Sequence, residues 1–454
     1  MSTPAQDTRA RPRPGDELVL DVDALAFGGA GVARAEGYVV FVDGAVPGDR
    51  VRAHVYKAKR AYGHARAVEV LEPSAQRIPP AADHPGAPWQ VLPYERQLAV
   101  KSEQVDDALR RIGKLDGFEL EPIVPAVQQW RYRNKLEYSF GSGPGGELVC
   151  GFHAPGRWDQ IVPLDDCLLA SERGNAAREQ VVAWARAHGL RAHDRRSREG
   201  ELRNLVVREG RRTGEVQVRL VTAPADLPLD ALAAGVQADS LLVTTTDAAG
   251  ETTAAGETEL VAGTEFIDEE LADLRLRISP LAFFQTNTEM AERLYGVAAE
   301  LADLRGTERL YDLYCGLGTI ALVLSTRAAQ VFGIELVPEA VADAITNARR
   351  NGIDNVQFFA GDVRLALREL VERAGRPDVV VVDPPRAGLS KKAVRRLIEA
   401  APKKVVYVSC NPTTLAPNAA QLAEAGYALR RVRPVDLFPQ TPHIECVAVL
   451  ERAA

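Results

Sequence analysis

The sequence has few cysteines, no long apolar run and no excess of positive charge, and each absence excludes a class of protein. Its five cysteines are scattered over 454 residues without paired spacing, which argues against a disulfide framework and predicts a protein of the reducing cytoplasm. No run of about eighteen apolar residues occurs, and the N-terminus lacks the apolar core of a secretory signal, so we expect neither a membrane span nor export. The net charge of -7 gives no general affinity for nucleic acid, which would have to come from local patches.

The pattern of apolar runs and turn residues changes along the chain and predicts a division into segments. Short strand-like runs separated by glycine-rich turns are typical of a small β-barrel, whereas regular strand–helix alternation after residue 280 is typical of a doubly wound α/β sheet. The predicted segments are a disordered tail over 1–15, an OB-like barrel over 16–73, a linker and helix over 74–115, a β-rich central domain over 116–280, and a Rossmann-like domain with a mostly parallel sheet over 281–454.

Two stretches combine basic and aromatic residues, as single-stranded RNA binding would need. Residues 50–66 contain six Lys or Arg, two tyrosines and no acid, with Lys57, Lys59 and Arg60 close together. Residues 130–135 read Trp-Arg-Tyr-Arg-Asn-Lys and include Arg131. The alternatives are a solvated loop on the barrel for the first stretch and a mixed-face edge strand for the second.

A glycine turn lies at the start of the Rossmann-like domain. Cys315-Gly316-Leu317-Gly318-Thr319 follows a short apolar strand and precedes an apolar helical run. The spacing is neither that of a dinucleotide site nor that of a nucleoside-triphosphate loop. With the acidic Asp312 in the strand, it suits S-adenosylmethionine. The alternative is a tight turn in another kind of α/β protein.

Acidic residues stand at the ends of three further strands of this domain. Glu335 lies about one strand–helix unit after the glycine turn, where an acid can bind both ribose hydroxyls of an adenosine. Asp362 is placed for the adenine amino group, and Asp383 for the methionine end of the cofactor. Each acid by itself could equally be a helix cap.

A cysteine follows the next strand in the sequence SCNP. Asn411-Pro412 forces a turn that would direct the thiol of Cys410 toward the cleft, where a thiolate could act as a nucleophile. The alternative is a buried, inert cysteine. Glu445, at the start of the last strand, could be a base near Cys410 or only a charge at a strand edge.

The motifs LYDLYCGLGT, FFQTN, DPPR, SCNPTT and HIE, in this order, closely resemble those of the bacterial RNA 5-methyluridine methyltransferases, and the N-terminal barrel resembles their TRAM domain. The resemblance implies an S-adenosylmethionine-dependent RNA uracil-5 methyltransferase in which Cys410 is the nucleophile and Glu445 removes a proton. It further implies that Phe283 or Phe284 stacks on the flipped uridine. The positions that match cofactor contacts are Gln285, Tyr314, Thr319, Glu335, Asp362 and Asp383. Position 319 is often Asn in the family, so Thr319 is expected to make a weaker contact.

The resemblance also sets expectations about cofactors and partners. Many relatives hold an iron–sulfur cluster with four cysteines, but only Cys167 matches one of them here, so we expect no cluster and expect His84 and Trp89 to pack in its place. We expect a cytoplasmic monomer that acts on RNA, with 23S ribosomal RNA favoured over transfer RNA. Two rivals remain open at this point. One is a nucleobase-amine methyltransferase, although Arg386 stands where its motif has an aromatic residue; the other is an RNA-binding protein with a retired catalytic domain.

Overall fold

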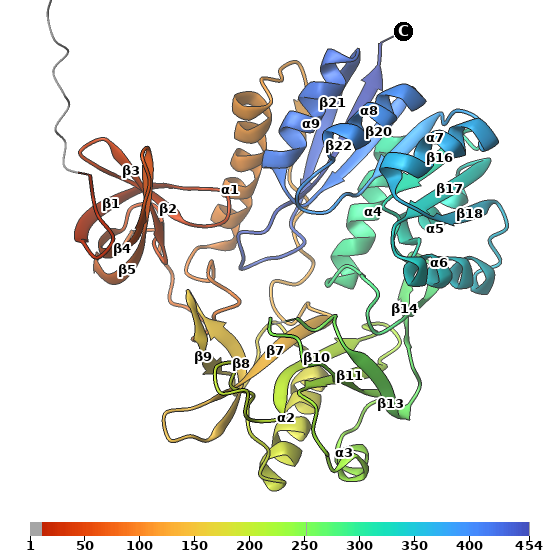
Figure 1. Ribbon diagram of the computed structural model, residues 1–454. Helices are drawn as coiled ribbons and strands as arrows, with labels where there is room; N and C mark the ends of the chain where they lie inside the picture. The colour runs from red at the N-terminus through yellow and green to blue at the C-terminus, as the bar shows by residue number, and fades with distance from the viewer. Residues whose placement is uncertain (1–10, 251, 454) are drawn as a thin grey trace, which may run out of the picture. The chain divides into compact units, whose positions relative to one another are not determined.

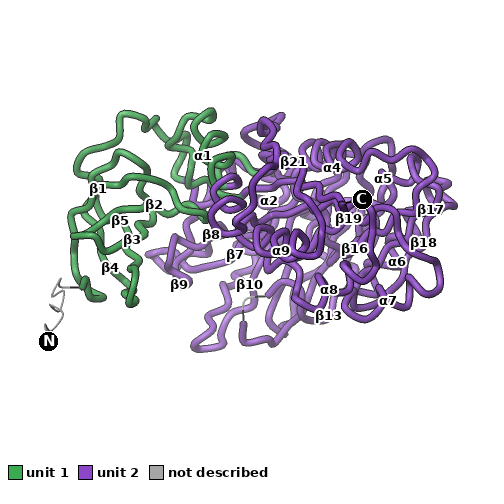
Figure 2. Tube along the Cα trace, turned by 90° about the horizontal axis from the view of Figure 1, so that it is seen from above, with its two compact units in different colours: residues 1–83, 87–104, 438–443 green, residues 84–86, 105–437, 444–454 purple. Residues whose placement is uncertain are grey.

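The computed structural model describes residues 11–250 and 252–453, so the first ten residues of the expected tail lie outside it. The chain divides into two compact units (Figure 2). The first contains the described residues up to 83, together with 87–104 and 438–443, and the second contains 84–86, 105–437 and 444 onward. The finer division predicted from the sequence stays a prediction. Within the described ranges, no helix is long and apolar enough to cross a membrane.

The first unit is built around a closed five-stranded barrel, which confirms the predicted fold of this region. Strand β4 shows why it forms: Val51, Ala53 and Val55 are fully buried and alternate with exposed or partly exposed polar residues, as one-sided burial requires. The strands, in barrel order, are β1 (Glu17–Leu25), β2 (Gly31–Ala35), β3 (Tyr38–Asp43), β5 (Tyr62–Glu72) and β4 (Arg50–Ala58). Most of helix α1 (Tyr94–Asp107) also belongs to this unit.

The second unit contains the β-rich central sheet that the sequence predicts. Its strands, in spatial order, are β13 (Glu257–Gly263), β12 (Ser240–Thr245), β11 (Val216–Thr222), β10 (Leu202–Glu209), β7 (Lys135–Ser142), β8 (Leu148–Ala154) and β9 (Arg157–Pro163). Helices α2 (Glu172–Ala187) and α3 (Leu229–Gly235) accompany it, and β14 (Ile267–Leu271) pairs with β15 (Leu274–Ile278). Ser171 caps α2 by accepting the backbone N–H of Gly174 at 2.9 Å, which explains why the helix begins there.

An eight-stranded sheet forms the C-terminal part of the unit (Figure 1). Its order is β18 (Val356–Ala360), β17 (Gln330–Glu335), β16 (Arg309–Leu313), β19 (Val379–Val382), β20 (Lys404–Ser409), β22 (Glu445–Arg452), β21 (Tyr427–Val435) and β6 (Glu119–Leu120). The helices are α4 (Thr288–Ala302), α5 (Thr319–Ser325), α6 (Pro338–Arg350), α7 (Val363–Ala374), α8 (Lys391–Ala400) and α9 (Pro412–Glu424). The first five strands are parallel neighbours, which confirms the Rossmann-like prediction.

The strand order fixes where this sheet can bind a ligand. From β16 the chain first moves outward through β17 and β18, and then returns to β19 and β20 on the other side of β16. Right-handed connections therefore place the two sets of helices on opposite faces and open a crevice at the carboxyl ends of β16 and β19. Strand β22 runs antiparallel to β20, so its first residue, Glu445, lies at this same edge.

Candidate active site

The glycine turn after β16 leaves its backbone open at one residue and packs it closely at another. Tyr314, Gly316 and Gly318 all have positive φ, at 67°, 53° and 85°. A Cβ at Gly318 would lie 2.7 Å from Phe358 Cζ and 3.0 Å from the Cβ of Ala344, whereas a Cβ at Gly316 would meet nothing within 4 Å. The turn is thus held by packing at Gly318 and presents free space at Gly316.

Glu335 ends β17 beside this turn. Its Oε2 accepts the backbone N–H of Gly316 at 3.1 Å, and its Oε1 accepts that of Val337 at 3.0 Å. The next two side chains, Leu336 and Val337, are 63% and 48% exposed. A fixed carboxylate beside uncovered apolar side chains suits a ribose with a flat base next to it.

The other residues predicted to contact the cofactor differ in their burial and in the hydrogen bonds that they make within the protein. Asp362 caps α7 by accepting the N–H of Arg364 at 2.8 Å, and it also forms an ion pair with the Arg364 side chain. Thr319 is the first residue of α5 and is buried. Gln285 is buried in the loop before α4. Cofactor contacts by these residues and by Tyr314 stay predictions.

Two acids with raised pKa values belong to neighbouring strand ends: Asp312, which is buried on β16, and Asp383, which follows β19 and is partly buried. Burial and then the nearby charge of Asp383 raise the pKa of Asp312 to about 8, and burial raises that of Asp383 to about 7. Asp312 accepts the N–H of Ala321 with Oδ2 at 3.0 Å, while its buried Oδ1 has no hydrogen-bond partner. An unpaired carboxylate oxygen of this kind favours a cationic or N–H-bearing ligand.

Tyr295 of α4 is buried within electrostatic reach of the same acids, a placement that the sequence did not reveal. Burial, and after it the charges of Asp383, Asp312 and Glu445, raises the pKa of its phenol far above the usual value. Only the apolar periodicity of α4 marks this position in the sequence, and that pattern indicates core.

Cys410 and Glu445 meet at the edge where β20 ends and β22 begins. Ser409 of β20 pairs with Cys446 of β22, and the two strands are antiparallel. Cys410, which follows Ser409, therefore lies beside Glu445, which precedes Cys446. Burial and then the charge of Glu445 raise the pKa of the Cys410 thiol to about 11. Glu445 is buried, and burial followed by the charge of Asp383 raises its pKa well above the usual carboxyl range. Cys410 alone among the five cysteines is partly exposed.

Asn411 ties the turn after Cys410 to the DPPR segment. Its Nδ2 donates to the carbonyl oxygen of Arg386 at 3.0 Å, and its Oδ1 accepts the N–H of Thr413 at 3.0 Å, so it also caps α9. Pro412 occupies the first turn of that helix. Thr414 Oγ1 donates to the same Arg386 carbonyl oxygen at 3.3 Å, so two side chains hold together the motifs that carry Asp383 and Cys410.

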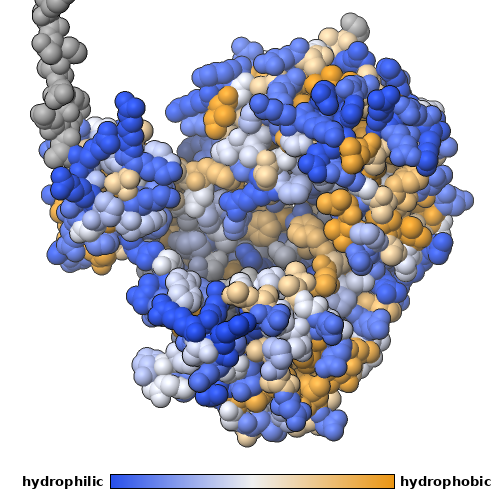
Figure 3. Space-filling model, viewed as in Figure 1, coloured by the Kyte–Doolittle hydropathy of each residue, from blue (hydrophilic) through white to orange (hydrophobic). Residues whose placement is uncertain are grey.

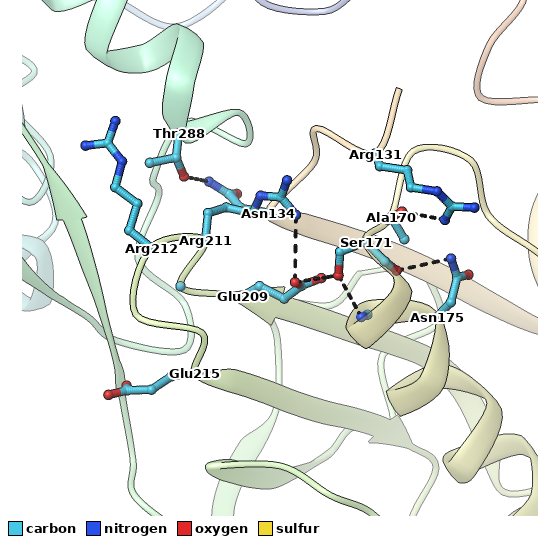
Figure 4. A network of polar contacts seen from close by, with 12 residues as sticks. Arg131, Asn134, Ala170, Ser171, Asn175, Glu209, Arg211, Arg212, Glu215 and Thr288 are labelled. Atoms are coloured by element: carbon cyan, nitrogen blue, oxygen red, sulfur yellow. Dashed lines mark hydrogen bonds and ion pairs between the residues drawn. The ribbon is translucent and has the colours of Figure 1, made fainter. Parts of the chain in front are cut away.

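Asn134, the residue before β7, is joined to Thr288 at the start of α4 and to the loop that precedes this helix; Figure 4 shows its contact with Thr288. Asn134 Nδ2 donates to the carbonyl oxygen of Gln285 at 2.9 Å and to Thr288 Oγ1 at 2.8 Å, and Thr288 Oγ1 donates to Glu269 Oε2 at 2.7 Å. In this loop Phe283 is 69% exposed and Phe284 is 5% exposed. Phe283 is thus the available ring for stacking, while Phe284 belongs to the core.

The structure also shows the contacts of Cys167, the one cysteine that matches a cluster ligand, and of Arg131 in the basic stretch 130–135. His84 Nε2 lies 3.3 Å from Cys167 Sγ, and both side chains are buried. Arg131 Nη2 lies 2.6 Å from Asp166 Oδ2, so its charge already has a partner. Residues 130–134 form no strand, and β7, which follows them, is interior to its sheet rather than at an edge. In the part of the chain that the structure describes, no group of three or more His, Cys, Asp or Glu could hold a metal ion.

Comparison with known proteins agrees with this arrangement. Residues 252–453 match the tRNA (uracil-5-)-methyltransferase family, and residues 12–68 match the TRAM domain. An uncharacterised RNA methyltransferase of Halalkalibacterium halodurans is 38% identical over 96% of this chain and 97% of its own length. Another, from Chlorobaculum tepidum, is 37% identical over the whole of both chains. The crystal structure of Pyrococcus abyssi tRNA (uracil-54, C5)-methyltransferase with S-adenosyl-L-homocysteine has a TM-score of 0.80 and 29% identity, and the match covers 95% of this chain and 99% of that one.

The fold and the edge at which these residues meet define a Rossmann-like, S-adenosylmethionine-dependent methyltransferase joined to an RNA-binding type of barrel. The chain belongs to the tRNA (uracil-5-)-methyltransferase family of RNA methyltransferases. The sequence-based prediction of an RNA (uracil-5-)-methyltransferase with a TRAM domain is therefore confirmed.

Proposed function

We propose that this protein forms 5-methyluridine in RNA by covalent catalysis through Cys410. The observation that carries the proposal is the meeting of a partly exposed thiol with the buried Glu445 at the ligand-binding edge of the sheet. A thiol next to a strong carboxylate base suits covalent activation followed by proton removal.

The residues around the glycine turn fit S-adenosylmethionine, which supplies an electrophilic methyl group when bound. Glu335 would hold the ribose, the open backbone at Gly316 would accommodate the ligand, and the unpaired Oδ1 of Asp312 would favour its cationic end. Gln285, Tyr314, Thr319, Asp362 and Asp383 would complete this site. For Asp362 to contact adenine, its carboxylate would have to share or exchange its present bond to Arg364.

The chain's own groups then act in sequence on the uracil. Cys410 loses its proton, for which Asp383, with a pKa raised to about 7 by burial, is a nearby acceptor, and Sγ bonds to carbon 6. Carbon 5 thereby gains the electron density that it needs to take the methyl group. Glu445 removes the proton from carbon 5, the bond between Sγ and carbon 6 breaks, and Cys410 is expelled. A carboxylate whose pKa is raised by burial is a stronger base, which suits Glu445 to remove the proton from carbon 5.

We infer that RNA is bound in part by the outer wall of the barrel. Tyr56 stacks on His64 at 6.0 Å between ring centroids, and Tyr62 lies 5.5 Å from the same imidazole. Lys59 Nζ lies 5.7 Å from the Tyr62 ring centroid. Aromatic faces beside cations are what single-stranded RNA needs for stacking and phosphate contact. Phe283, uncovered at the methyltransferase edge, would stack on the target base itself.

The substrate that we propose is 23S ribosomal RNA, as the resemblance to TRAM-bearing enzymes suggests. Transfer RNA is the second candidate, favoured by the similarity to a tRNA (uracil-54, C5)-methyltransferase along 95% of the chain. Mapping of 5-methyluridine in both RNAs from a deletion strain decides between them. Loss of one ribosomal 5-methyluridine is the expected result, and loss of a transfer-RNA modification alone would reverse the assignment.

The covalent step is tested with two variants of the site. Cys410→Ala should abolish turnover but keep cofactor binding, because the thiol is needed only for activation. Glu445→Gln should methylate carbon 5 and then fail to release the RNA, which leaves a protein–RNA adduct on a denaturing gel. Full activity of Cys410→Ala would remove the covalent mechanism.

We also propose that the enzyme works as a monomer. We further propose that it carries no iron–sulfur cluster, since Cys167 has His84 as a close partner and the other expected cysteine ligands are missing. Protein purified without oxygen should be colourless and carry no stoichiometric iron. Iron near four atoms per chain that depends on Cys167 would contradict this.

A further inference from the structure

A large aromatic side chain stands uncovered on the outermost strand of the central sheet. Trp158 lies on β9, at the end of the strand order, and is 52% exposed. Two guanidinium groups lie over its ring: Arg196 Cζ is 5.2 Å and Arg195 Cζ is 5.9 Å from the centroid. Hydrophilic side chains gather over the region of β8 and β9 (Figure 3). An exposed indole flanked by cations is an arrangement typical of binding surfaces.

The cations come from one segment, residues 191–203, which consists of the end of the loop after α2 and the first two residues of β10. It contains five arginines and three acids in a chain whose net charge is -7. Two of the acids shape the segment: Asp194 accepts the backbone N–H groups of Arg196 and Ser197 at 2.7 and 2.9 Å, and Glu201 accepts that of Arg191 at 2.8 Å. The third, Glu199, lies 3.8 Å from Arg191. The acids of this segment thus bind its backbone and Arg191. Arg195 and Arg196 lie over the tryptophan, and the carboxylates of Asp194 and Asp159 are within electrostatic reach of Arg196.

A depression of about 630 Å³, lined by polar and apolar residues alike, adjoins the tryptophan through Arg195, which takes part in both. It lies where β10 begins and where β11 and β12 end. Its wall includes His193, Arg195, Arg198 and Arg203, together with the acids Glu201 and Asp247. Arg203 is fixed in place by donating to the carbonyl oxygens of Thr246, Ala248 and Gly250, at 3.1, 2.7 and 2.7 Å. Basic groups thus line the depression next to a stacking ring.

We propose that Trp158 and the arginine-rich segment, residues 191–203, form a second RNA-binding surface, on the central domain. An unpaired nucleotide stacks on Trp158, and the adjoining phosphates contact Arg195, Arg196 and the arginines of the depression. Single-stranded RNA matches both halves of this surface, since every base has a face for the indole and every linkage has a charge for a guanidinium. An acidic protein would use only the cations. The inference rests on the proposed function for its choice of ligand, and it adds a contact outside the methyl-transfer site.

Anisotropy of a labelled, short oligouridine RNA bound to the full-length protein, measured over a range of salt concentrations, tests this surface. Trp158→Ala should weaken binding by about 5- to 150-fold, the range for one lost base stack, and Trp158→Phe should keep most of the affinity. Arg196→Ala should lower the slope of log affinity against log salt by a little under one unit. Leu365→Ala and Arg373→Ala, which alter exposed side chains on α7, are the matched controls and should leave both quantities unchanged.

Cofactor binding by calorimetry serves as the check of folding and should be the same in all variants. Wild-type affinity and salt slope in both Trp158→Ala and Arg196→Ala would overturn the proposed surface, and would leave this segment to an acidic protein or to solvent. If those variants also methylate RNA like the wild type, the proposed function stands while the surface fails. If oligouridine binding depends on Trp158 but the wild type methylates no RNA, the surface stands and the proposed function fails.

Discussion

At the scale of single residues, Cys410 differs from the other cysteines in both exposure and surroundings. Cys150, Cys167, Cys315 and Cys446 are buried, whereas Cys410 is partly exposed, so iodoacetamide should alkylate Cys410 first in the native protein. Because burial and Glu445 raise its pKa to about 11, the rate should climb about tenfold per pH unit from neutral pH to beyond pH 9. Mass spectrometry of the Cys410 peptide measures this rate.

The same experiment on Glu445→Gln is the control for the cause of the shift. Removal of the neighbouring negative charge should lower the pKa of the thiol, so alkylation at pH 9 should be faster than in the wild type. A wild-type rate that levels off near pH 7, or modification of a buried cysteine first, would contradict the prediction.

Asp312 carries a second prediction, on stability. Burial, with a smaller effect from the charge of Asp383, raises its pKa in the folded state from 3.8 to about 8. The folded protein therefore holds a proton that the unfolded chain releases, so this contribution to stability is present at acid pH and is lost as the pH rises through about 8. Asp312→Asn keeps an oxygen for the Ala321 N–H and has no charge to bury. Relative to wild type, its free energy of unfolding should improve between pH 5 and pH 8.5 by about 4 kcal/mol, since each of the roughly three pH units below the folded-state pKa contributes about 1.4 kcal/mol.

Urea unfolding at the two pH values measures that difference. At pH 8.5, where the wild-type carboxyl is largely ionised, the variant should also bind S-adenosylmethionine more weakly, since Oδ1 is the oxygen without a partner. A stability difference that does not vary with pH would show that Asp312 is ionised in the folded protein.

At the scale of elements, the two glycines of the turn after β16 have different roles: Gly318 allows close packing, and Gly316 leaves space for a ligand. An alanine at Gly318 would clash with Phe358 and Ala344 in addition to its positive φ, so Gly318→Ala should destabilise the protein by roughly 2–4 kcal/mol. Gly316→Ala meets no protein atom within 4 Å and should cost only about 1 kcal/mol of backbone strain. Its methyl group would occupy the open space of the turn, so cofactor affinity should fall nevertheless.

Denaturant unfolding and calorimetry on the two alanine variants measure these effects. Equal losses of stability would mean that packing does not distinguish the two positions. Unchanged cofactor affinity in Gly316→Ala would place the ligand elsewhere.

At the scale of the whole molecule, affinity for RNA is expected to be separable from chemistry. Replacing Lys57, Lys59 and Arg60 together by alanine should raise the Michaelis constant for RNA and flatten its salt dependence by nearly one unit for each lost phosphate contact. The rate at saturating RNA should change little, because these residues belong to the barrel unit and Cys410 and Glu445 to the other.

The barrel itself supplies the control. Arg50 lies 3.1 Å from Glu72, and Arg52 lies 2.5 Å from Glu69, so their charges are already paired. Alanine at both positions should affect RNA binding less than the triple change does. The same affinity and salt slope in the triple variant as in the wild type would make residues 57–60 a solvated loop.

The sequence by itself determined the local structure and the residue types from which the candidate site is built. Short strand-like runs between glycine-rich turns predicted the barrel, and regular strand–helix alternation predicted the Rossmann-like domain, because these signals act within a few residues. The ordered motifs identified the family, since they lie at turns where backbone geometry restricts the residue type. The roles of Cys410, Glu445 and the cofactor residues remain predictions from those motifs.

Only the tertiary structure decided which distant residues meet. The antiparallel insertion of β22 beside β20 brings Glu445 to Cys410, and β6, from a segment ahead of the central domain, joins the edge of the same sheet. Asn134 holds the loop at Gln285, Tyr295 comes within electrostatic reach of Asp312 and Asp383, and Arg196 lies over Trp158. Strand order and register depend on contacts between residues tens to hundreds of positions apart, and no periodicity or local motif encodes such pairings.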